Sequence, residues 1–450
     1  MLTLAALSLL SVATAQKVGS ETAESHPSFT WTKCTGPGAC ETIDTEVVID
    51  SNWRWTHGVD SMENCYDGND WTDVCSSNDD CAENCVIEGA DYEGTYGAST
   101  SGDALTLKFV TEHEYGKNVG SRLYLLEDPD TYQMFDLIGN EFTFDVDLST
   151  VACGMNSALY FVAMEPDGGM SSYPANEAGA HYGTGYCDAQ CARDLKWIGG
   201  QGNFEGWEPS SSDASAGVGK LGSCCAEIDV WESNSHSFAL TPHACEVGNN
   251  GYHVCEDQDC GGTYSDDRYA GHCDANGCDY NPFRMGNKDF YGAGKTLDTT
   301  KPFTVVTQFE AQNLHQFFIQ DGTKIEIPGP TWSGLPADSS DINPALCDAL
   351  FDVFEEDTDR YADVGGWTAM EEALSLPMVL VMSIWADHYA NMLWLDGLWP
   401  RDAPEDQPGA LRGDCPADSG VPDEVIEEHA DAYVTWSNIR FGPIGSTTDV

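Results

Sequence analysis

Hydrophobic and polar residues alternate with a period of two in several segments of the chain, as they do in strands that are buried on one face. In residues 47–56 this alternation places Val47, Ile49, Trp53 and Trp55 on one side. Five further segments follow the same pattern, at residues 141–148, 158–163, 303–310, 378–385 and 433–441. The chain is therefore predicted to consist mainly of β-strands.

The segments between these strands indicate the kind of fold. Residues 317–327 are predicted to form a hairpin, because Asp321-Gly322 supplies the residues that two-residue turns favour. Helical periodicity is scarce and is clearest over residues 368–376. Glycine and cysteine concentrate between the predicted strands, above all at residues 181–287, and no repeat or Ser/Thr/Pro-rich linker divides the chain. We therefore predict an all-β fold, a single antiparallel sandwich with long, disulfide-stapled loops.

The composition combines a strong negative charge with an ordinary capacity to form a core. Of the 450 residues, 75 are Asp or Glu and 19 are Lys or Arg, which gives a formal net charge of −56. This balance argues against a nucleic-acid partner or an anionic membrane surface, since both are bound through a basic face. Hydrophobic residues make up 41% of the chain and aromatic residues 11%, which is enough for a buried core. The 18 cysteines, an even number, indicate disulfide pairing in an oxidising compartment.

Residues 1–15 are expected to be a secretory signal peptide. An apolar stretch from Leu2 to Val12 is followed by Ala-Thr-Ala at residues 13–15, which fits a cleavage site, although no Lys or Arg precedes the apolar stretch. A buried N-terminal strand is the alternative. No later segment reaches the roughly 18 apolar residues that a membrane-spanning helix needs. The mature chain, residues 16–450, is predicted to be a single domain that is secreted and extracellular.

A cluster of three acidic residues stands out because of its neighbours. Glu227, Asp229 and Glu232 form the pattern E-x-D-x-x-E within the segment SCCAEIDVWES. In so acidic a chain this pattern also arises by chance, and a solvated acidic strand is one interpretation of it. The apolar residues between the acids predict a buried strand instead, where carboxylates are costly unless they are hydrogen-bonded or functional.

The spacing of these acids can bring all three to one face of a strand. Glu227 and Asp229, two residues apart, share a face, whereas Glu232 would lie on the opposite one. One β-bulge near Val230–Trp231 would return Glu232 to the shared face, roughly 13 Å from Glu227 between Cα atoms. Side chains that lean together would bring the carboxyl groups near the ~5 Å of a retaining glycosidase, not the ~6.5–9.5 Å of an inverting one. Asp229 between them would hydrogen-bond one carboxylate and separate the two pKa values.

Longer motifs resemble those of glycoside hydrolase family 7, the eukaryotic cellobiohydrolases and endoglucanases. The similarity extends from about residue 28 to residue 446 and includes NWRWTH, NCYDGN, GTGYCDAQC, RDLKWIGGQ, SCCAEIDVWE, CGGTYSDDRY, TLDTTKPFTVVTQFE, YANMLWLD and SNIRFGPIGST. The resemblance implies a jelly-roll β-sandwich of two curved antiparallel sheets, with loops that form a substrate tunnel over a long cellulose-binding path. It also implies that no metal or organic cofactor is needed.

The resemblance assigns roles to the acidic cluster. Glu227 matches the family's nucleophile, Glu232 matches its general acid/base, and Asp229 matches the carboxylate that supports the nucleophile. His243, in the segment ALTPHAC, matches a histidine that lines the site near the acid/base. Taken without the resemblance, His243 is typical of a structural loop histidine.

The resemblance also implies a row of sugar-binding residues. Sugar rings present apolar C–H faces that stack on aromatic planes. The matching positions are Trp53, Trp55, Trp385 and Trp394 as platforms, with Trp55 toward the entrance and Trp394 on the product side; Tyr160, Asp188 and Gln190 near the cleaved residue, with Asn156 as a weaker candidate; and Arg268, Asp279 and Arg412 around the product sugars. Core packing of the tryptophans and surface ion pairs of the arginines are the interpretations that the residues alone leave open.

The family pattern further implies a pairing of all 18 cysteines, which their positions in the sequence could not select. The nine implied bridges are Cys34–Cys40, Cys65–Cys85, Cys75–Cys81, Cys153–Cys415, Cys187–Cys225, Cys191–Cys224, Cys245–Cys273, Cys255–Cys260 and Cys278–Cys347. Two of them, Cys187–Cys225 and Cys191–Cys224, would clamp a loop to the catalytic strand.

Some positions depart from the family pattern. Asn276 and Ala386 stand where well-known relatives have Asp, which bears on the product-side and nearby subsites. Val86 and a cysteine-free N-terminus replace a further bridge of many fungal members, and we expect no linker or cellulose-binding module. Residues 210–221 and 261–271 match loops that roof the tunnel of cellobiohydrolases and that endoglucanases of the family shorten or lack.

The sequence therefore predicts a secreted, monomeric, retaining cellobiohydrolase of the reducing-end type. Its expected partners are cellulose chains and cello-oligosaccharides, with no nucleic acid and no membrane. An endo-acting β-1,4-glucanase with an open cleft is an alternative on the same fold. A carbohydrate-binding lectin is a second alternative, but a lectin has no use for two glutamates that bracket a bond. No EF-hand pattern supports a calcium-binding matrix protein.

Overall fold

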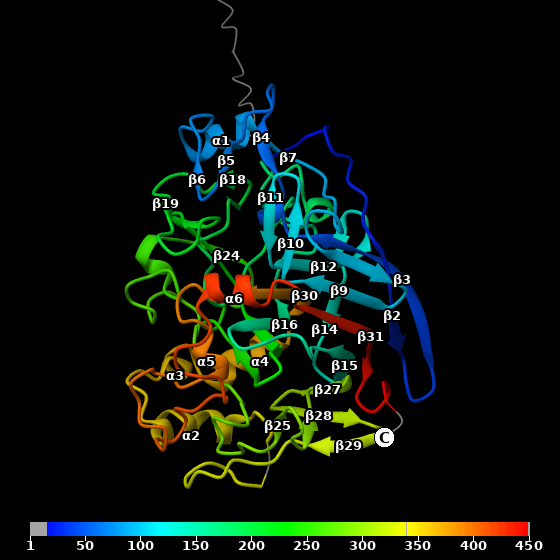
Figure 1. The fold of residues 1–450 in the computed structure, drawn as a ribbon, viewed down its shortest axis with the longest axis vertical. Coiled ribbons are helices and arrows are strands. Elements are labelled where there is room, and N and C mark those ends of the chain that lie inside the picture. Colours follow the sequence, from blue (N-terminus) through cyan, green and yellow to red (C-terminus); the bar gives the residue numbers. More distant parts are fainter. Residues whose placement is uncertain (1–15, 339, 449–450) are drawn as a thin grey trace, which may run out of the picture.

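The computed structural model of the protein describes residues 16–338 and 340–448. The predicted signal peptide, residues 1–15, lies outside the described residues. The main strands form one curved hydrogen-bonded ladder (Figure 1). In spatial order these strands are β23 (Phe238–His243), β22 (Glu227–Ser233), β16 (Met155–Val162), β30 (Pro377–Ala386), β12 (Ser121–Asp128), β3 (Cys40–Ile49), β2 (Ser28–Cys34), β31 (Tyr433–Pro443), β15 (Asn140–Asp147), β27 (Phe303–Glu310), β28 (Asn313–Gln320) and β29 (Thr323–Glu326). Neighbours are antiparallel except β2 and β31, which run parallel.

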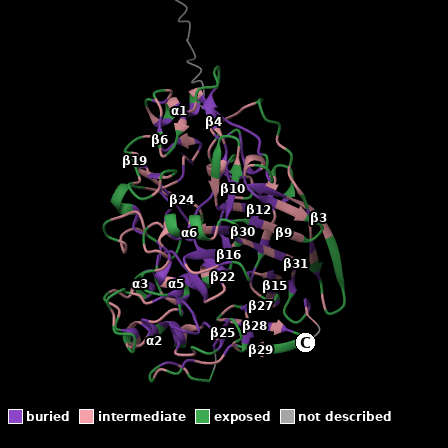
Figure 2. Cartoon of the chain, viewed as in Figure 1, coloured by how far each residue is buried: buried purple, intermediate pink, exposed green. Residues whose placement is uncertain are grey.

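The ladder folds back on itself, so that its two halves pack face to face. Phe161 of β16 contacts Phe142 of β15 with ring centroids 5.1 Å apart, and Phe309 of β27 at 6.2 Å. Trp231 of β22 contacts Phe144 of β15 at 6.1 Å. These strands are not neighbours in the ladder, and the residues between them are buried (Figure 2). The predicted all-β sandwich with two curved sheets is therefore confirmed, with the sheets continuous through β3 and β2.

Shorter strands form the loops and edges around this sandwich. They are β1 (Lys17–Val18), β4 (Thr56–Gly58), β5 (Tyr66–Asp67), β6 (Asp70–Trp71), β7 (Cys85–Ile87), β8 (Ala98–Ser101), β9 (Ala104–Lys108), β10 (Val110–His113), β11 (Gly116–Val119), β13 (Thr131–Tyr132), β14 (Met134–Asp136), β17 (Trp197–Ile198), β18 (Gln201–Gly202), β19 (Glu208–Pro209), β20 (Gly217–Val218), β21 (Leu221–Cys224), β24 (His253–Glu256), β25 (Tyr291–Gly292) and β26 (Leu297–Asp298). Within residues 16–338 and 340–448, three 3-10 turns accompany them, η1 (Ser51–Trp53), η2 (Ala180–Tyr182) and η3 (Asp257–Cys260).

Most of the strands predicted from alternation are confirmed. β15, β16, β27, β30 and β31 cover the five later segments. β28 and β29 form the predicted hairpin, in which Gln320 pairs with Thr323 around Asp321-Gly322. Both turn residues have positive φ, 53° at Asp321 and 74° at Gly322, as a two-residue hairpin turn requires.

The strand predicted at residues 47–56 is wrong in its second half. β3 ends at Ile49 because Asp50 starts the turn η1, where its Oδ1 accepts a hydrogen bond from the backbone N–H of Asn52 at 2.6 Å. The chain changes direction there, so Trp53 and Trp55 do not continue the face of Val47. A single capping carboxylate therefore overrides the alternation.

Six helices lie among the described residues, and the longest of them was not predicted. They are α1 (Asn78–Asn84), α2 (Pro344–Phe354), α3 (Arg360–Asp363), α4 (Trp367–Leu374), α5 (Leu393–Asp396) and α6 (Pro422–Glu428). α4 confirms the helix predicted at residues 368–376. α2 begins with Pro344 in its first turn, after Asn343, whose Oδ1 accepts from the backbone N–H of Leu346 at 3.1 Å. In the described part of the chain, no helix has the length and apolar character needed to cross a membrane.

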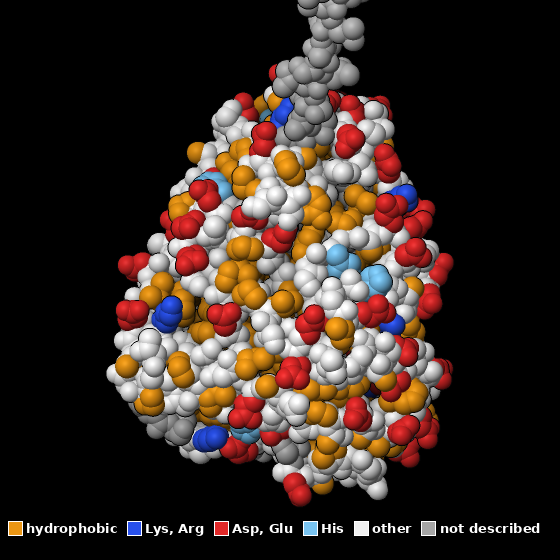
Figure 3. Space-filling view, turned by 180° about the vertical axis from the view of Figure 1, so that it is seen from behind, with side chains coloured by type: hydrophobic (Ala, Val, Ile, Leu, Met, Phe, Trp, Pro, Cys, Tyr) orange, Lys and Arg blue, Asp and Glu red, His pale blue; other side chains and the backbone are white. Residues whose placement is uncertain are grey.

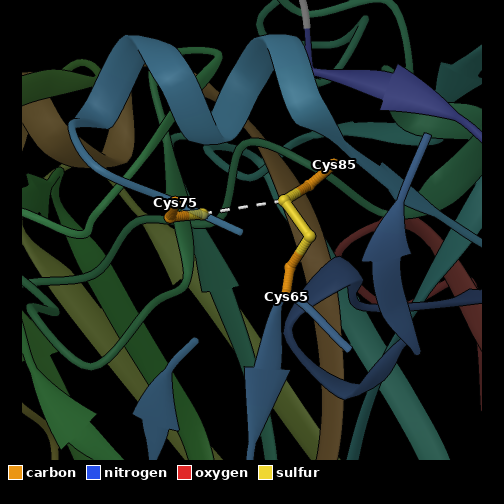
Figure 4. Close-up of side chains that lie close together, drawn as sticks. All are labelled: Cys65, Cys75 and Cys85. Atoms are coloured by element: carbon orange, nitrogen blue, oxygen red, sulfur yellow. Dashed lines mark hydrogen bonds between the residues drawn. A yellow bond between two sulfur atoms is a disulfide. The ribbon is translucent and has the colours of Figure 1, made fainter. Parts of the chain in front are cut away.

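All nine implied disulfides are present, so the predicted pairing is confirmed. Figure 4 shows the Cys65–Cys85 bridge beside α1, with the Sγ of Cys75 lying 3.6 Å from the Sγ of Cys85. Cys75 is bonded to Cys81 and Cys85 to Cys65, so these clustered sulfurs are not free thiolates. The bridges tie α1 and β7 to the loop that follows Trp55.

Candidate active site

The strand register places the three acids of β22 on one face. Glu227, Asp229 and Glu232 pair with every second residue of β16, from Val162 to Ala158. On the other side of β22 they also pair with every second residue of β23. Residues two apart on a strand share a face, and so the three carboxylates share one.

This arrangement depends on a bulge in β22. The register shifts by one residue between Asp229 and Glu232, which confirms the bulge predicted near Val230–Trp231. Trp231 turns into the core, where it is fully buried and stacks on Phe238 at 5.0 Å. Glu227 and Glu232 therefore pair with residues of β16 that are four positions apart, Val162 and Ala158, which corresponds to about 13 Å between Cα atoms.

Glu227 lies in a buried hydrogen-bonded setting. Its side chain is held by the backbone N–H of Ala189, which donates to Oε2 at 3.0 Å, and by a hydrogen bond with Asp229. Burial, and then the charges of Asp229 and Asp188, raise the pKa of Glu227 well above its usual range. A proton shared between Glu227 and Asp229 removes the repulsion that raises the pKa of both carboxyl groups.

Asp229 connects this pair to His243. The Nε2 of His243 lies 2.9 Å from Oδ2 of Asp229, and its Nδ1 donates to the carbonyl of Asp274 at 2.9 Å. A carbonyl can only accept, so Nδ1 carries a proton and Nε2 is aimed at Asp229. Burial, followed by the charge of Glu232, raises the pKa of Asp229 well above its usual range. The structure thus places His243, which the family resemblance implied in the site, beside Asp229 of the acidic cluster.

Glu232 has a different environment. Its pKa is raised to about 7 by burial, against the lowering effects of His243 and Asn156. The Nδ2 of Asn156 donates to Oε1 of Glu232 at 2.9 Å, while its Oδ1 accepts from the backbone N–H of Ser233 at 2.9 Å. A carboxyl group that keeps its proton up to about pH 7 can act as a general acid.

Two disulfides fix the loop that carries Asp188 and Gln190. Cys187–Cys225 and Cys191–Cys224 tie it to the start of β22. The backbone N–H of Cys225 also donates to the carbonyl of Asp188 at 3.1 Å. Burial raises the pKa of Asp188 to about 6. The predicted clamp is therefore present, and it places Asp188 beside Glu227.

Tyr160 has two partners that the sequence analysis missed. Its hydroxyl lies 3.0 Å from the hydroxyl of Tyr186. The guanidinium of Arg122 lies 3.3 Å from the ring centroid of Tyr186 and 5.2 Å from that of Trp53. Register places Arg122 opposite Ser383 on the face of the acidic cluster. The sequence signals that could have pointed to these partners were Arg122 within the apolar segment SRLYLL and Tyr186 within the motif GTGYCDAQC.

The four predicted platforms have different surroundings. Trp385 of β30 and Trp394 of α5 lie with ring centroids 6.4 Å apart and 29° between their planes. Trp53 packs against the core and donates from Nε1 to the carbonyl of Gly120 at 3.0 Å. Trp55 is half-buried outside the main core and stacks on His57 at 4.2 Å. The indole N–H of Trp55 donates to Oδ1 of Asn64 at 2.9 Å.

Arg268, predicted beside the product sugars, and Gln190, predicted near the cleaved residue, meet at Ala275. The Nη2 of Arg268 and the Nε2 of Gln190 both donate to the carbonyl of Ala275 at 2.7 Å. The Nε of Arg268 donates to Oδ1 of Asn276 at 2.8 Å. An amide oxygen at residue 276 therefore accepts the hydrogen bond of Arg268 without a negative charge.

A second group surrounds Asp279. Its carboxylate pairs with Arg284 and lies 3.9 Å from Nη1 of Arg412. Arg412 is further held by a hydrogen bond from its Nε to the carbonyl of Gly409 at 2.8 Å. Arg284 was not predicted, and burial lowers its pKa to about 9.

Comparisons with known proteins agree with this geometry. A family model described as glycosyl hydrolase family 7 matches residues 18–448. A cellobiohydrolase from Melanocarpus albomyces, solved in complex with cellotetraose, is 68% identical, with a TM-score of 0.94 over 96% of this chain and 100% of that one. A family 7 cellobiohydrolase from Daphnia pulex is 45% identical, with a TM-score of 0.93 over the same shares. The Humicola insolens endocellulase EGI is 37% identical, with a TM-score of 0.79 over the same shares. The chain is a glycoside hydrolase and belongs to glycosyl hydrolase family 7.

Proposed function

We propose that the protein is a retaining cellobiohydrolase that releases cellobiose processively from the reducing ends of cellulose chains. The observation that carries this proposal is the placement of Glu227 and Glu232 on one strand face in unlike environments. Glu227 accepts a hydrogen bond from the backbone N–H of Ala189 and lies beside Asp229, whereas Glu232 accepts from Asn156 and keeps its proton up to about pH 7. One carboxylate can then attack while the other donates a proton.

The reaction follows from these two environments. With the shared proton on Asp229, Glu227 is an anion that attacks the anomeric carbon, while Glu232 protonates the leaving glycosidic oxygen. A covalent glycosyl-enzyme forms, and the leaving sugar departs as an alcohol. Water then attacks the same carbon, Glu232 takes its proton, and Glu227 is released. Two inversions at one carbon retain its configuration.

The support for chain-end action comes from the loops and the relatives. The loops at residues 210–221 and 261–271 are present, and the two cellobiohydrolases match the chain with higher identity and TM-score than the endocellulase does. Trp53, Trp55 and the neighbouring Trp385 and Trp394 offer platforms for several sugar rings. Nine disulfides fit a secreted protein that acts outside the cell as a monomeric catalytic domain over residues 16–450.

Substitution of the two glutamates tests this mechanism. Glu227→Gln and Glu232→Gln should each lower cellulose hydrolysis by at least 10²- to 10⁴-fold, the range for loss of a positioned acid or base. Glu310→Gln, an exposed glutamate at the end of β27, is the matched control and should keep full activity.

An aryl cellobioside with a good leaving group separates the two roles. Glu232→Gln should still release a burst of phenol, because such a leaving group needs little acid assistance, while Glu227→Gln should release none. Small and equal losses in both variants would contradict the assignment. Rapid viscosity loss on soluble cellulose by the unaltered enzyme, in place of cellobiose release, would instead indicate an endoglucanase.

A further inference from the structure

The turn after β30 reaches a loop from a distant part of the chain. The Nδ1 of His388 lies 2.8 Å from the backbone carbonyl of Ser212, and its Nε2 lies 3.6 Å from Oδ2 of Asp213. A carbonyl can only accept, so Nδ1 carries a proton and donates it to Ser212. Both side chains are largely shielded, with 17% of His388 and 22% of Asp213 exposed. We call these two contacts the His388 clasp.

The loop on one side of the clasp, residues 210–216, is preorganised by its own hydrogen bonds. Asp213 uses Oδ1 to accept from the backbone N–H of Ser215 at 2.8 Å, which leaves Oδ2 turned toward His388. The Nδ2 of Asn69 donates to the carbonyls of Ser210 and Asp213 at 2.9 and 3.1 Å. These bonds position the acceptor in the loop, and His388 adds the contact that ties the loop to the turn after β30.

The turn on the other side is organised by Asp387. Its Oδ1 accepts from the backbone N–H groups of Tyr389 and Ala390 at 2.7 and 3.1 Å, and its Oδ2 accepts from the indole N–H of Trp394 at 2.9 Å. The ring of Tyr389 meets the ring of Tyr264, from residues 261–271, edge to face at 5.5 Å. The turn thus joins the loop at residues 210–216 to the segment of Tyr264.

The strand order shows what lies between the two halves of the clasp. Residues 210–221 lead into β21 and then into Glu227, which pairs with Val162 at one end of β16. His388 follows Ala386, which pairs with Met155 at the opposite end of β16. The back of this sheet is packed against the other half of the sandwich. The contact of His388 with Ser212 therefore joins segments that connect to the sheet at opposite ends of β16.

We propose that His388 is a specificity-determining residue, because its clasp closes the roof of the substrate path over Glu227 and Glu232. This inference rests on the proposed function. A closed roof admits a cellulose chain from its end, whereas an open one admits an internal stretch from the side. His388 does not contact the reacting atoms in this account, and it acts by holding two loops together.

The clasp itself can be tested by hydrogen exchange on the full chain. In His388→Ala, the backbone amides of residues 210–216 should exchange about fivefold faster than in the unaltered enzyme, as expected for loss of one net hydrogen bond. In His388→Asn exchange should stay close to that of the unaltered enzyme, because the Asn amide N–H replaces Nδ1–H as donor to Ser212. Unchanged exchange in His388→Ala would overturn the clasp, whatever the substrate of the enzyme.

The consequence for specificity is tested by where new chain ends appear on amorphous cellulose. The ratio of insoluble to soluble reducing ends should rise about fivefold in His388→Ala and stay near its original value in His388→Asn. His315→Ala is the control, because His315 on β28 makes another histidine–carboxylate contact, in which its Nδ1 lies 2.7 Å from Oδ1 of Asp341. This substitution should not change the ratio of insoluble to soluble reducing ends. An unchanged ratio in His388→Ala, or equal increases in the Ala and Asn variants, would overturn the role of His388. Predominantly insoluble ends from the unaltered enzyme would overturn the proposed chain-end action instead, independently of the exchange result.

Discussion

The side-chain amide of Asn156 donates a hydrogen bond to Oε1 of Glu232 at 2.9 Å, across the pairing of β16 and β22. A donor at this position stabilises the ionised carboxylate and so lowers the pKa of Glu232, while burial raises it to about 7 overall. Asn156 thus sets how far into neutral pH Glu232 remains an acid.

Asn156→Ala should therefore shift the alkaline limb of the pH–rate profile to higher pH. Loss of one hydrogen bond to a charged group corresponds to about one pKa unit. The measurement is kcat/KM for a soluble cello-oligosaccharide across the alkaline limb. Asn140→Ala, which removes a hydrogen bond to Asp136 away from the cluster, is the control and should leave the limb in place. A shift of the limb to lower pH in Asn156→Ala would contradict this role.

The acidic cluster should make the folded protein less stable as the pH rises. The pKa of Glu232 rises from an ordinary 4.5 to about 7 in the folded protein, so between these values the native state holds a proton that the unfolded chain has released. Where the native state binds more protons, the free energy of unfolding falls with increasing pH. This contribution is fully present below about pH 4.5 and is lost as the pH passes through 7.

Glu232→Gln removes this titration and should gain stability relative to the unaltered enzyme as the pH rises. The measurement is the difference in melting temperature between the two proteins at several values between pH 4.5 and 8. The variant should gain steadily on the unaltered enzyme over this range. A constant difference would show that Glu232 titrates alike in the folded and unfolded chains.

Trp55 should serve capture of a cellulose chain and not the chemistry. Its ring is stacked on His57 outside the main core, whereas Trp385 pairs with Asn156, whose amide binds Glu232. Trp55→Ala should lower the rate on crystalline cellulose by about tenfold, as expected for loss of one stacking contact, and change kcat/KM on short soluble substrates little. Trp385→Ala is the matched variant, and it should lower the activity on both crystalline cellulose and short soluble substrates. Equal losses on both substrates in Trp55→Ala would mean that this ring supports the fold.

Local features of the fold could be predicted from the sequence, whereas contacts between distant residues could not. The period-two alternation of hydrophobic and polar residues located the strands β15, β16, β27, β30 and β31. It did so because residues of these strands pack into the buried core. The alternation failed at Asp50, where a side-chain cap begins the turn η1 and β3 ends. Hydrophobic periodicity also missed α2, which its capping residue and its first-turn proline indicate more strongly.

Long-range contacts within the site were outside the reach of such patterns. The spacing of Glu227, Asp229 and Glu232 required a bulge, and the register contains it. The bond from Asn156 to Glu232 and the clasp from His388 to Ser212 join residues far apart in the chain. Such contacts depend on how whole strands and loops are placed, and the residue types at the two positions do not specify them.

Salt should stabilise the protein, because its net charge is unusually large for its surface. The accessible surface is 18160 Å², so a net charge of −56 leaves roughly one negative charge per 320 Å², or about 18 Å between neighbours if they are spread evenly. Figure 3 shows acidic side chains distributed over one face, with few lysines and arginines among them. Self-repulsion should therefore act on the folded state in dilute buffer.

The range of this repulsion depends on ionic strength. The Debye length is about 30 Å in 0.01 M salt, longer than the spacing between charges, and about 3 Å in 1 M salt, much shorter than that spacing. Screening also weakens exposed ion pairs such as Lys220–Glu256, but with only 19 basic residues these are few, and each contributes little. Screening should consequently remove more repulsion than attraction.

The melting temperature should thus rise between 0.01 M and about 2 M NaCl, with most of the change below about 0.3 M, where the Debye length falls fastest, and the rate of cellulose hydrolysis should not fall over the same range. A parallel series in sucrose at matched osmolality is the control, since sucrose is excluded from the protein surface but screens no charge. A melting temperature that is independent of salt would assign the carboxylates to solubility alone. A melting temperature that falls steadily with added salt would show that net attraction dominates, and the charge argument would then be wrong.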